Sequence, residues 1–154
     1  MNSLLSTVSV GLVGAIIPNP TCVTPDTSFS QVVALMGQGR STCSVAPSTG
    51  SAALAYVGSA AHESRLSCVL VVEDDVLVGI LTERDVVKQV VKGRSTTHLA
   101  VRKVMSTSVV CLPVWQFTDV FVATNLLRQH GIRHLPLVDR QWRVLGLLTH
   151  ESLQ

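Results

Sequence analysis

The chain has 154 residues and a formal net charge of +2 at pH 7, and 47% of its residues are hydrophobic while 14% are charged. At this length, that apolar content is enough to fill the core of a compact fold, which argues against an intrinsically disordered protein. The basic residues form no run, and few aromatic side chains are present to stack on bases, so we expect no nucleic acid partner.

Residues 1–19 form an apolar lead-in. Met1 to Ile17 resembles a signal sequence in hydropathy, but it begins with no basic residue and has no clear small-residue cleavage site before Pro18. Gly and Ser residues interrupt the stretch and leave it too short to span a bilayer. We therefore expect residues 1–19 to dock on the folded module, with a membrane or export role as the alternative.

A first helix and a long loop follow the lead-in. The extended segment Val23-Thr-Pro25 leads into an apolar periodicity through Val32 and Met36, which predicts a helix. Residues 37–61 are dominated by Gly, Ser, Ala and Thr and offer little that fills a core. We expect a flexible insertion here, a surface loop rather than a functional lid.

A hairpin and a second helix come next. Cys68 to Val72 and Val76 to Leu81 are short runs rich in Val, Ile and Leu, separated by an acidic turn, which predicts two paired strands. After Thr82 the pattern becomes helical, with an apolar stripe that ends at Gly93. The stripe consists of Val86, Val87, Val90 and Val91.

The same order of elements then recurs. Cys111-Leu-Pro113 precedes an apolar-periodic stretch from Val120 to Leu127, and residues 134–149 repeat the hairpin. Two copies of one supersecondary unit are therefore expected. The second copy stops at Gln154, before a helix like that of the first copy completes its turns. This predicts a segment cut from a longer chain, with the loss of the final helix as the alternative.

Three stretches carry a resemblance to a known family: Gly-Ile-Leu-Thr82-Glu-Arg-Asp85, Gly131-Ile-Arg-His-Leu-Pro136, and Val104-Met105 between the copies. Together with the repeat, they resemble the cystathionine-β-synthase (CBS) domain family. The resemblance implies an α+β fold of two βαββα-type units related by a pseudo-twofold axis, over residues 20–98 and 99–154. It also implies a regulatory module of a signalling protein that senses AMP, ADP, ATP or S-adenosylmethionine.

Thr82 and Asp85 are the first candidate ligand contacts. At a helix start, their hydroxyl and carboxylate lie beside the first free backbone N–H groups, where a sugar diol or a phosphate can be held. The same spacing is close to a capping box, so a purely structural cap is the alternative. The resemblance favours a nucleotide contact, and Arg84 between the two residues joins the candidate site.

Arg133 and His134 supply the positive charge that a phosphate needs, because Arg can donate two parallel hydrogen bonds and His one more. The resemblance implies that this pair meets the helix start of the other unit across the axis. The alternative is a solvated Arg beside a half-buried His. The extended segment before the first helix adds Thr24 and Pro25 to the candidate nucleotide-binding residues.

A second, weaker site is expected at Thr149 and Ser152, where a hydroxyl stands in place of the carboxylate and binds a ribose diol less firmly. Its opposing strand start reads Leu66-Ser67-Cys68 where the other copy has Ile132-Arg133-His134, with Arg65 nearby as the substitute cation.

No catalytic or metal-binding pattern is found. His130 and His134 have i, i+4 spacing, but Gly131 and Pro136 argue against a shared helix, and no phosphate loop, nucleophile elbow or Cys–His signature is present. The four cysteines show no paired spacing, as is typical of a reduced cytoplasmic protein. We therefore expect no enzyme, no catalytic cofactor and no metal.

These observations predict a cytoplasmic sensor that binds an adenine nucleotide between its two units and signals to an effector domain of the same or another chain. Surplus apolar surface on the helices predicts a homodimer through them. The alternative is a structural dimerisation module without a ligand.

Overall fold

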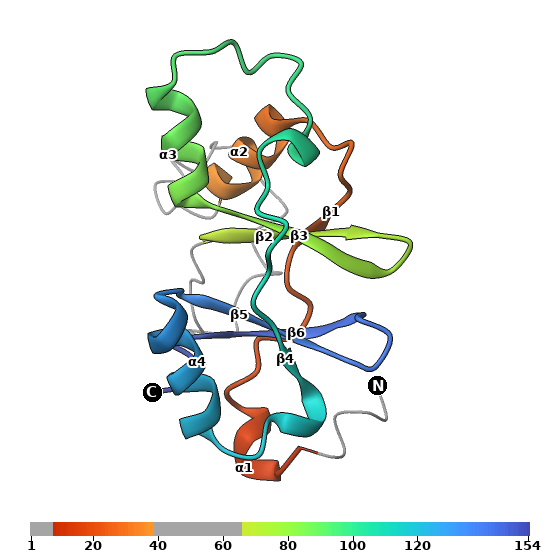
Figure 1. Ribbon diagram of the computed structural model, residues 1–154, viewed down its shortest axis with the longest axis vertical. Coiled ribbons are helices and arrows are strands. Elements are labelled where there is room, and N and C mark those ends of the chain that lie inside the picture. The colour runs from red at the N-terminus through yellow and green to blue at the C-terminus, as the bar shows by residue number, and fades with distance from the viewer. Residues whose placement is uncertain (1–7, 39–65) are drawn as a thin grey trace, which may run out of the picture.

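The computed structural model describes residues 8–38 and 66–154. The described chain forms two three-stranded sheets, one above the other in Figure 1, with four α-helices around them. This confirms the predicted α+β fold of two similar units.

The first unit consists of β1 (Cys22–Val23), α2 (Phe29–Gln38), β2 (Cys68–Glu73), β3 (Val76–Thr82) and α3 (Glu83–Val91). The second consists of β4 (Leu112–Pro113), α4 (Val120–His130), β5 (His134–Val138) and β6 (Val144–Thr149). In each sheet the first strand pairs in parallel with the second, and the second pairs antiparallel with the third. The short helices α1 (Val10–Val13), η2 (Val101–Lys103) and η3 (Val114–Gln116) are additional to this repeat.

Two reversals of the chain follow from the local sequence. Asp74 and Asp75 have φ of 51° and 64°, the left-handed backbone that a two-residue hairpin turn between twisted strands requires. Gly131 ends α4 with φ of 60°, a conformation that costs glycine little. The break after α4 leaves His130 on the helix and His134 on β5, so the two histidines do not share a helix, as predicted.

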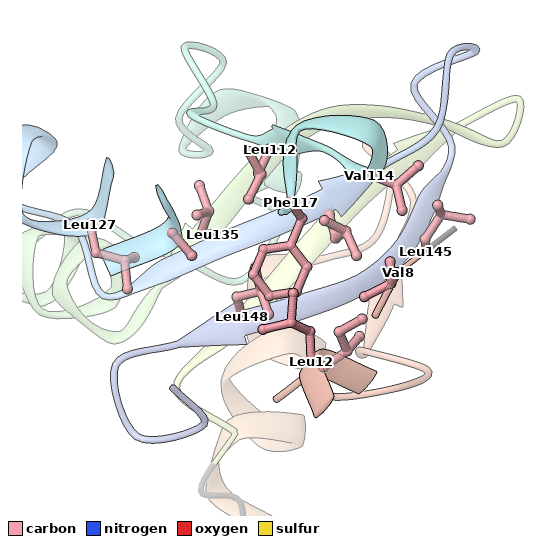
Figure 2. Packing of buried hydrophobic residues seen from close by; sticks show 12 residues of the cluster. Val8, Leu12, Leu112, Val114, Phe117, Leu127, Leu135, Leu145 and Leu148 are labelled. Atoms are coloured by element: carbon pink, nitrogen blue, oxygen red, sulfur yellow. The ribbon is translucent and has the colours of Figure 1, made fainter. Parts of the chain in front are cut away.

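Each unit has a core of its own. The first core lies between α2 and its sheet and includes Phe29, Val32, Met36, Val69, Val71 and Leu81. The second lies between α4 and its sheet and includes Leu112, Phe117, Leu127, Leu135 and Leu148 (Figure 2).

Each core is completed by the segment that precedes the other unit. Val101 of η2 joins the first core. Leu12 (Figure 2) and Ile16 of the lead-in join the second. The backbone groups of Ile17 and Leu147 exchange two hydrogen bonds, at 2.9 and 3.0 Å, which fix the lead-in along β6. A matching pair of bonds joins residues 80 and 106 in the first unit, so the two crossings are equivalent.

Gly79 and Gly146 allow these crossings. A Cβ atom at Gly146 would lie 3.1 Å from the carbonyl oxygen of Ile17 and would overlap the Ile16 side chain. At Gly79 it would lie 2.5 Å from the sulfur of Met105. The repeated glycine therefore marks the place in each sheet where another segment passes at short range.

Gly146→Ala is expected to lower the free energy of unfolding by about 1–3 kcal/mol, because the added methyl group meets the Ile17 backbone, which cannot move away as a flexible side chain can. Gly37→Ala is the matched control, since nothing lies within 4 Å of a Cβ there and alanine suits the α2 helix. Urea unfolding of both variants measures the difference. A Gly146→Ala protein as stable as the wild type would contradict this close crossing.

The two sheets face each other through Leu70, Leu77 and Val138. The backbone N–H of Leu77 donates to the carbonyl oxygen of Trp142 at 3.0 Å, so both hairpin turns lie at the same end of the molecule, on the right in Figure 1. We call this the hairpin end. The opposite end, where β2 and β5 begin and β3 and β6 finish, is the helix end.

Helix α3 buries fewer of its valines against the sheet than the apolar stripe predicts. Val86 contacts the first core, but Val87, Val90 and Val91 are 60%, 69% and 80% exposed, and α3 has no buried residue. Val87, Val90 and Val91 therefore form an outward apolar face of α3.

The insertion predicted over residues 37–61 lies outside the described residues, apart from its first two residues, which complete α2. Arg65 also lies outside them. Among residues 8–38 and 66–154, no helix is both long and apolar enough to cross a membrane.

Candidate functional site

The helix end brings side chains of both units together. The backbone N–H of Glu83 donates to the carbonyl oxygen of Ser67 at 3.0 Å, which ties the first residue of α3 to the segment before β2. The Ser67 hydroxyl lies 2.6 Å from Nε2 of His134, the first residue of β5. Ser67 therefore connects the start of α3 in the first unit with His134 in the second.

Thr82 and Asp85 form a cap at the start of α3. Oδ2 of Asp85 accepts hydrogen bonds from the Thr82 backbone N–H at 3.0 Å and from the Thr82 hydroxyl at 2.9 Å. The Lys88 ammonium lies 3.8 Å from Oδ1, and the Asp85 side chain is only 13% exposed. The structural role that the sequence left open is thus present, with one carboxylate oxygen engaged by the cap and the other facing a cation.

The imidazole of His134 is half-buried among charged groups from three elements. Burial lowers the pKa of His134 from its usual 6.5, and the adjacent Arg133 lowers it further, while the carboxylates of Glu83 and Glu151 act in the opposite direction. Because the net shift is downward, His134 is mainly neutral at pH 7.

Sequence reasoning did not assign a contact to Ser67. In the sequence, Ser67 stands where the second copy has Arg133. The repeat places Ser67 and the Arg133–His134 pair at equivalent strand starts of the two units, but whether such starts touch depends on how the sheets pack. The hydrogen bond between Ser67 and His134 is therefore a finding of the structure.

The remaining residues of the first candidate site lie at different ends. Arg84 and Arg133 are exposed at the helix end, beside the start of α3 and of β5. Thr24 and Pro25 follow β1, which runs parallel to β2 and points toward the hairpin end. The Pro25 carbonyl oxygen accepts from the backbone N–H of Arg102 at 3.0 Å. The structure thus does not bring Thr24 and Pro25 next to the α3 start.

The second candidate site repeats the cap with hydroxyl groups. Ser152 Oγ accepts from the Thr149 backbone N–H at 2.9 Å, and Thr149 Oγ1 accepts from the Ser152 N–H at 3.1 Å. Residues 150–153 form turns rather than a regular helix. Because Ser152 stands in the place of Asp85, the second site has a hydroxyl where the first site has a carboxylate. Arg65, the cation predicted for the second site, lies outside the described residues.

A cleft of about 410 Å³ lies at the hairpin end, away from the predicted site. It is lined by Cys22, Val72, Asp75, Asp139, Arg143, Val144 and Leu145. Within it, the buried Asp139 carboxylate accepts from Arg143 Nε at 2.8 Å and from two backbone N–H groups at 2.9 Å. Across the described ranges, no three His, Cys, Asp or Glu side chains gather as a metal site would require.

A protein-family model described as the CBS domain matches residues 55–92 and 101–153. The chain belongs to the CBS domain family. The two matches fall on the two units, so the chain contains a CBS pair, the arrangement known as a Bateman module.

Two curated relatives are similar to this chain over only part of their own length. An uncharacterised protein of Methanopyrus kandleri is 36% identical over 88 residues, which is 56% of this chain and 44% of the relative. An inosine-5'-monophosphate dehydrogenase of Thermoplasma acidophilum is 36% identical over 83 residues, 54% of this chain and 16% of the enzyme. The matched region thus spans less than half of either relative.

Solved structures show the same fold. A protein with CBS domains from Burkholderia ambifaria has 23% identity and a TM-score of 0.63, over 91% of this chain and 81% of that one. CBSX2 in complex with AMP has 19% identity and a TM-score of 0.62, over 90% and 89%. The CBS pair of protein MJ0100, in complex with 5'-methylthioadenosine and S-adenosyl-L-methionine, has 16% identity and a TM-score of 0.65, over 90% and 88%.

Proposed function

We propose that this CBS pair is a non-catalytic regulatory module that binds an adenine nucleotide between its units at the helix end. The observation that carries the proposal is the junction at Ser67, which sets the start of α3 in the first unit against His134 in the second. Two of the CBS pairs of the same fold hold adenine compounds, AMP in one and 5'-methylthioadenosine with S-adenosyl-L-methionine in the other. The likeness to the dehydrogenase gives no support to catalysis here, because it covers 16% of that enzyme.

The proposed roles follow from the chemistry of each group. Asp85 accepts from the ribose hydroxyls through Oδ1, while Oδ2 continues to cap α3. Arg133 is exposed and donates to phosphate oxygens, and His134 adds a donor beside it. The partial positive charge at the N-terminus of α3 favours the negative charge of the phosphate. The hydroxyl start at Thr149 is a weaker second site.

An adenine nucleotide is expected to raise the melting temperature of the protein. At a concentration of about a hundred times its dissociation constant, a ligand that binds only the folded state adds roughly 2.7 kcal/mol, which for a chain of this length corresponds to about 5–10 °C. A thermal-shift series with AMP, ADP, ATP, S-adenosylmethionine and GTP, each at millimolar concentration, measures it. If none of them moves the melting curve, the alternative function, a dimerisation module without ligand, replaces the sensor.

We propose that binding is transmitted through a homodimer. Val87, Val90 and Val91 form the outward apolar face of α3, and Phe121 on α4 is 70% exposed. A second molecule of this protein would bury this exposed apolar surface in a twofold-symmetric dimer, in which identical faces pack against each other. A ligand that binds one arrangement of the two units better than another then shifts the dimer and its effector domain.

Val90→Lys is expected to weaken the dimer, because it places a charge within the apolar face of α3 while lysine preserves helix formation. Val10→Lys is the control, since Val10 is 92% exposed on the separate helix α1. Light scattering over a range of micromolar concentrations gives the mass of each variant. A monomer mass for the wild-type protein refutes the dimer and removes this route of transmission.

A further inference from the structure

The hydrogen bond between Ser67 and His134 occupies one of the two ring nitrogens through which His134 can donate to a phosphate. Nε2 of His134 lies 2.6 Å from the Ser67 hydroxyl, and this bond joins the strand start of one unit to the strand start of the other. An imidazole nitrogen within a hydrogen bond of this length has no room for a phosphate oxygen. We call this arrangement, in which Ser67 holds Nε2, the closed arrangement.

The surroundings of the imidazole favour its neutral form when no ligand is bound. Partial burial disfavours a positive charge on His134, and Arg133, which precedes it at the strand start, repels that charge as well. Glu83 at the start of α3 and Glu151 in the turn after β6 attract it, but they do not reverse the net effect. A neutral imidazole forms the hydrogen bond with the Ser67 hydroxyl, and Arg133 is then the cation of the site.

We propose that the Ser67–His134 hydrogen bond closes the nucleotide site in the free protein, and that a phosphate-bearing ligand opens it by replacing Ser67 and adding one solvent proton to His134. This inference rests on the proposed function. A phosphate beside His134 and Arg133 supplies the negative charge that the free site lacks, so the protonated imidazole becomes the stable form and donates from the nitrogen that Ser67 held. Ser67 is then a positioning residue that sets how easily the site opens.

The sign of the pH effect follows from this exchange. In the free protein, His134 is neutral at any pH above its lowered pKa. In the complex its pKa is higher, so at a pH between these two values binding of the ligand takes up a proton. Affinity for AMP is therefore expected to rise by roughly tenfold as the pH falls from 8 to 6, since an adjacent opposite charge raises a pKa by about one unit or more. 5'-Methylthioadenosine, which has no phosphate, is expected to show no such rise.

Isothermal titration of the full chain with AMP, in two buffers of different ionisation enthalpy, measures the number of protons taken up. His134→Gln is the matched variant, because glutamine retains a hydrogen-bonding group for Ser67 but does not titrate. The AMP phosphate itself titrates near pH 6 and is coupled to His134 in the wild-type complex, so the difference between wild type and His134→Gln reports the proton that the His134–phosphate pair takes up. Proton uptake that is equal in the two proteins overturns the proposal.

Ser67→Ala tests the closing contact separately. Without the hydroxyl, no internal bond has to be broken, so AMP is expected to bind about two- to tenfold more tightly at pH 7, while Ser95→Ala, at an exposed loop residue, leaves the affinity unchanged. Weaker binding by Ser67→Ala would mean that Ser67 itself holds the ligand, and would overturn the closing role. Binding of AMP with no effect of pH or of Ser67→Ala refutes this inference alone, whereas no binding of any nucleotide refutes the proposed function as well.

Discussion

Arg133→Ala is expected to weaken nucleotide binding by about 1.5–3 kcal/mol, roughly ten- to a hundredfold in dissociation constant, with little change in the free energy of unfolding. Arg133 is exposed at the helix end, where a guanidinium is free to form two parallel hydrogen bonds to a phosphate. Titration of the wild-type protein and the variant with AMP gives the two constants. Arg94→Ala removes the same charge after the far end of α3 and is the control.

Asp85 requires a different substitution, because its carboxylate caps α3. Asp85→Ala removes the cap as well as the ligand contact and is expected to cost about 1 kcal/mol of stability. Asp85→Asn retains an oxygen for the cap but lacks the charge. If the Asp85 variants lose stability but keep their affinity for AMP, the cap is the only role of Asp85. If Arg133→Ala also binds AMP as the wild type does, Arg133 is only a surface charge.

Leu12→Ala is expected to lower the free energy of unfolding by about 2–3 kcal/mol, near the low end of the cost for a buried leucine. Leu12 is 9% exposed and belongs to the core of the second unit, although it precedes the first unit in the chain (Figure 2). Val10→Ala, on the same helix α1 but 92% exposed, is expected to change stability by no more than about 0.5 kcal/mol. Urea unfolding compares the two variants.

Equal stabilities of Leu12→Ala and Val10→Ala would show that the lead-in is not part of the second core. Because Gly146→Ala disturbs the docking of the same lead-in at Ile16 and Ile17, the double variant Leu12→Ala with Gly146→Ala provides a further check. Residues that hold one segment in place do not contribute independently, so the combined loss is expected to be smaller than the sum of the single losses.

Much of the fold is encoded locally and is read correctly from the chain. Short valine-rich runs around Asp74 and Asp75 predict the first hairpin, since these two residues tolerate the positive φ of a tight turn. Thr82 predicts the start of α3 and Gly93 its end within two residues. The repetition of these patterns predicts two units, because each pattern depends on neighbours a few residues away.

The site was predicted less completely because its parts meet only after the units have packed. Thr82 and Asp85 were identified from their spacing, yet spacing does not reveal which carboxylate oxygen is engaged by the cap. Thr24 and Pro25 share a sequence neighbourhood with the first unit, but the parallel pairing of β1 with β2 directs them to the hairpin end. Pairing direction is a property of the sheet and not of the strand.

The sequence by itself determined the elements, the turns and the repeat, since these arise from propensities and periodicities within short windows. Only the tertiary structure decided which segment completes each core and which side chains meet at the helix end. The lead-in crosses β6 at Gly146 and residues 101–106 cross β3 at Gly79, and both contacts join residues far apart in the chain. The Ser67–His134 bond arises in the same way, from two strand starts that approach each other where the sheets of the two units pack together.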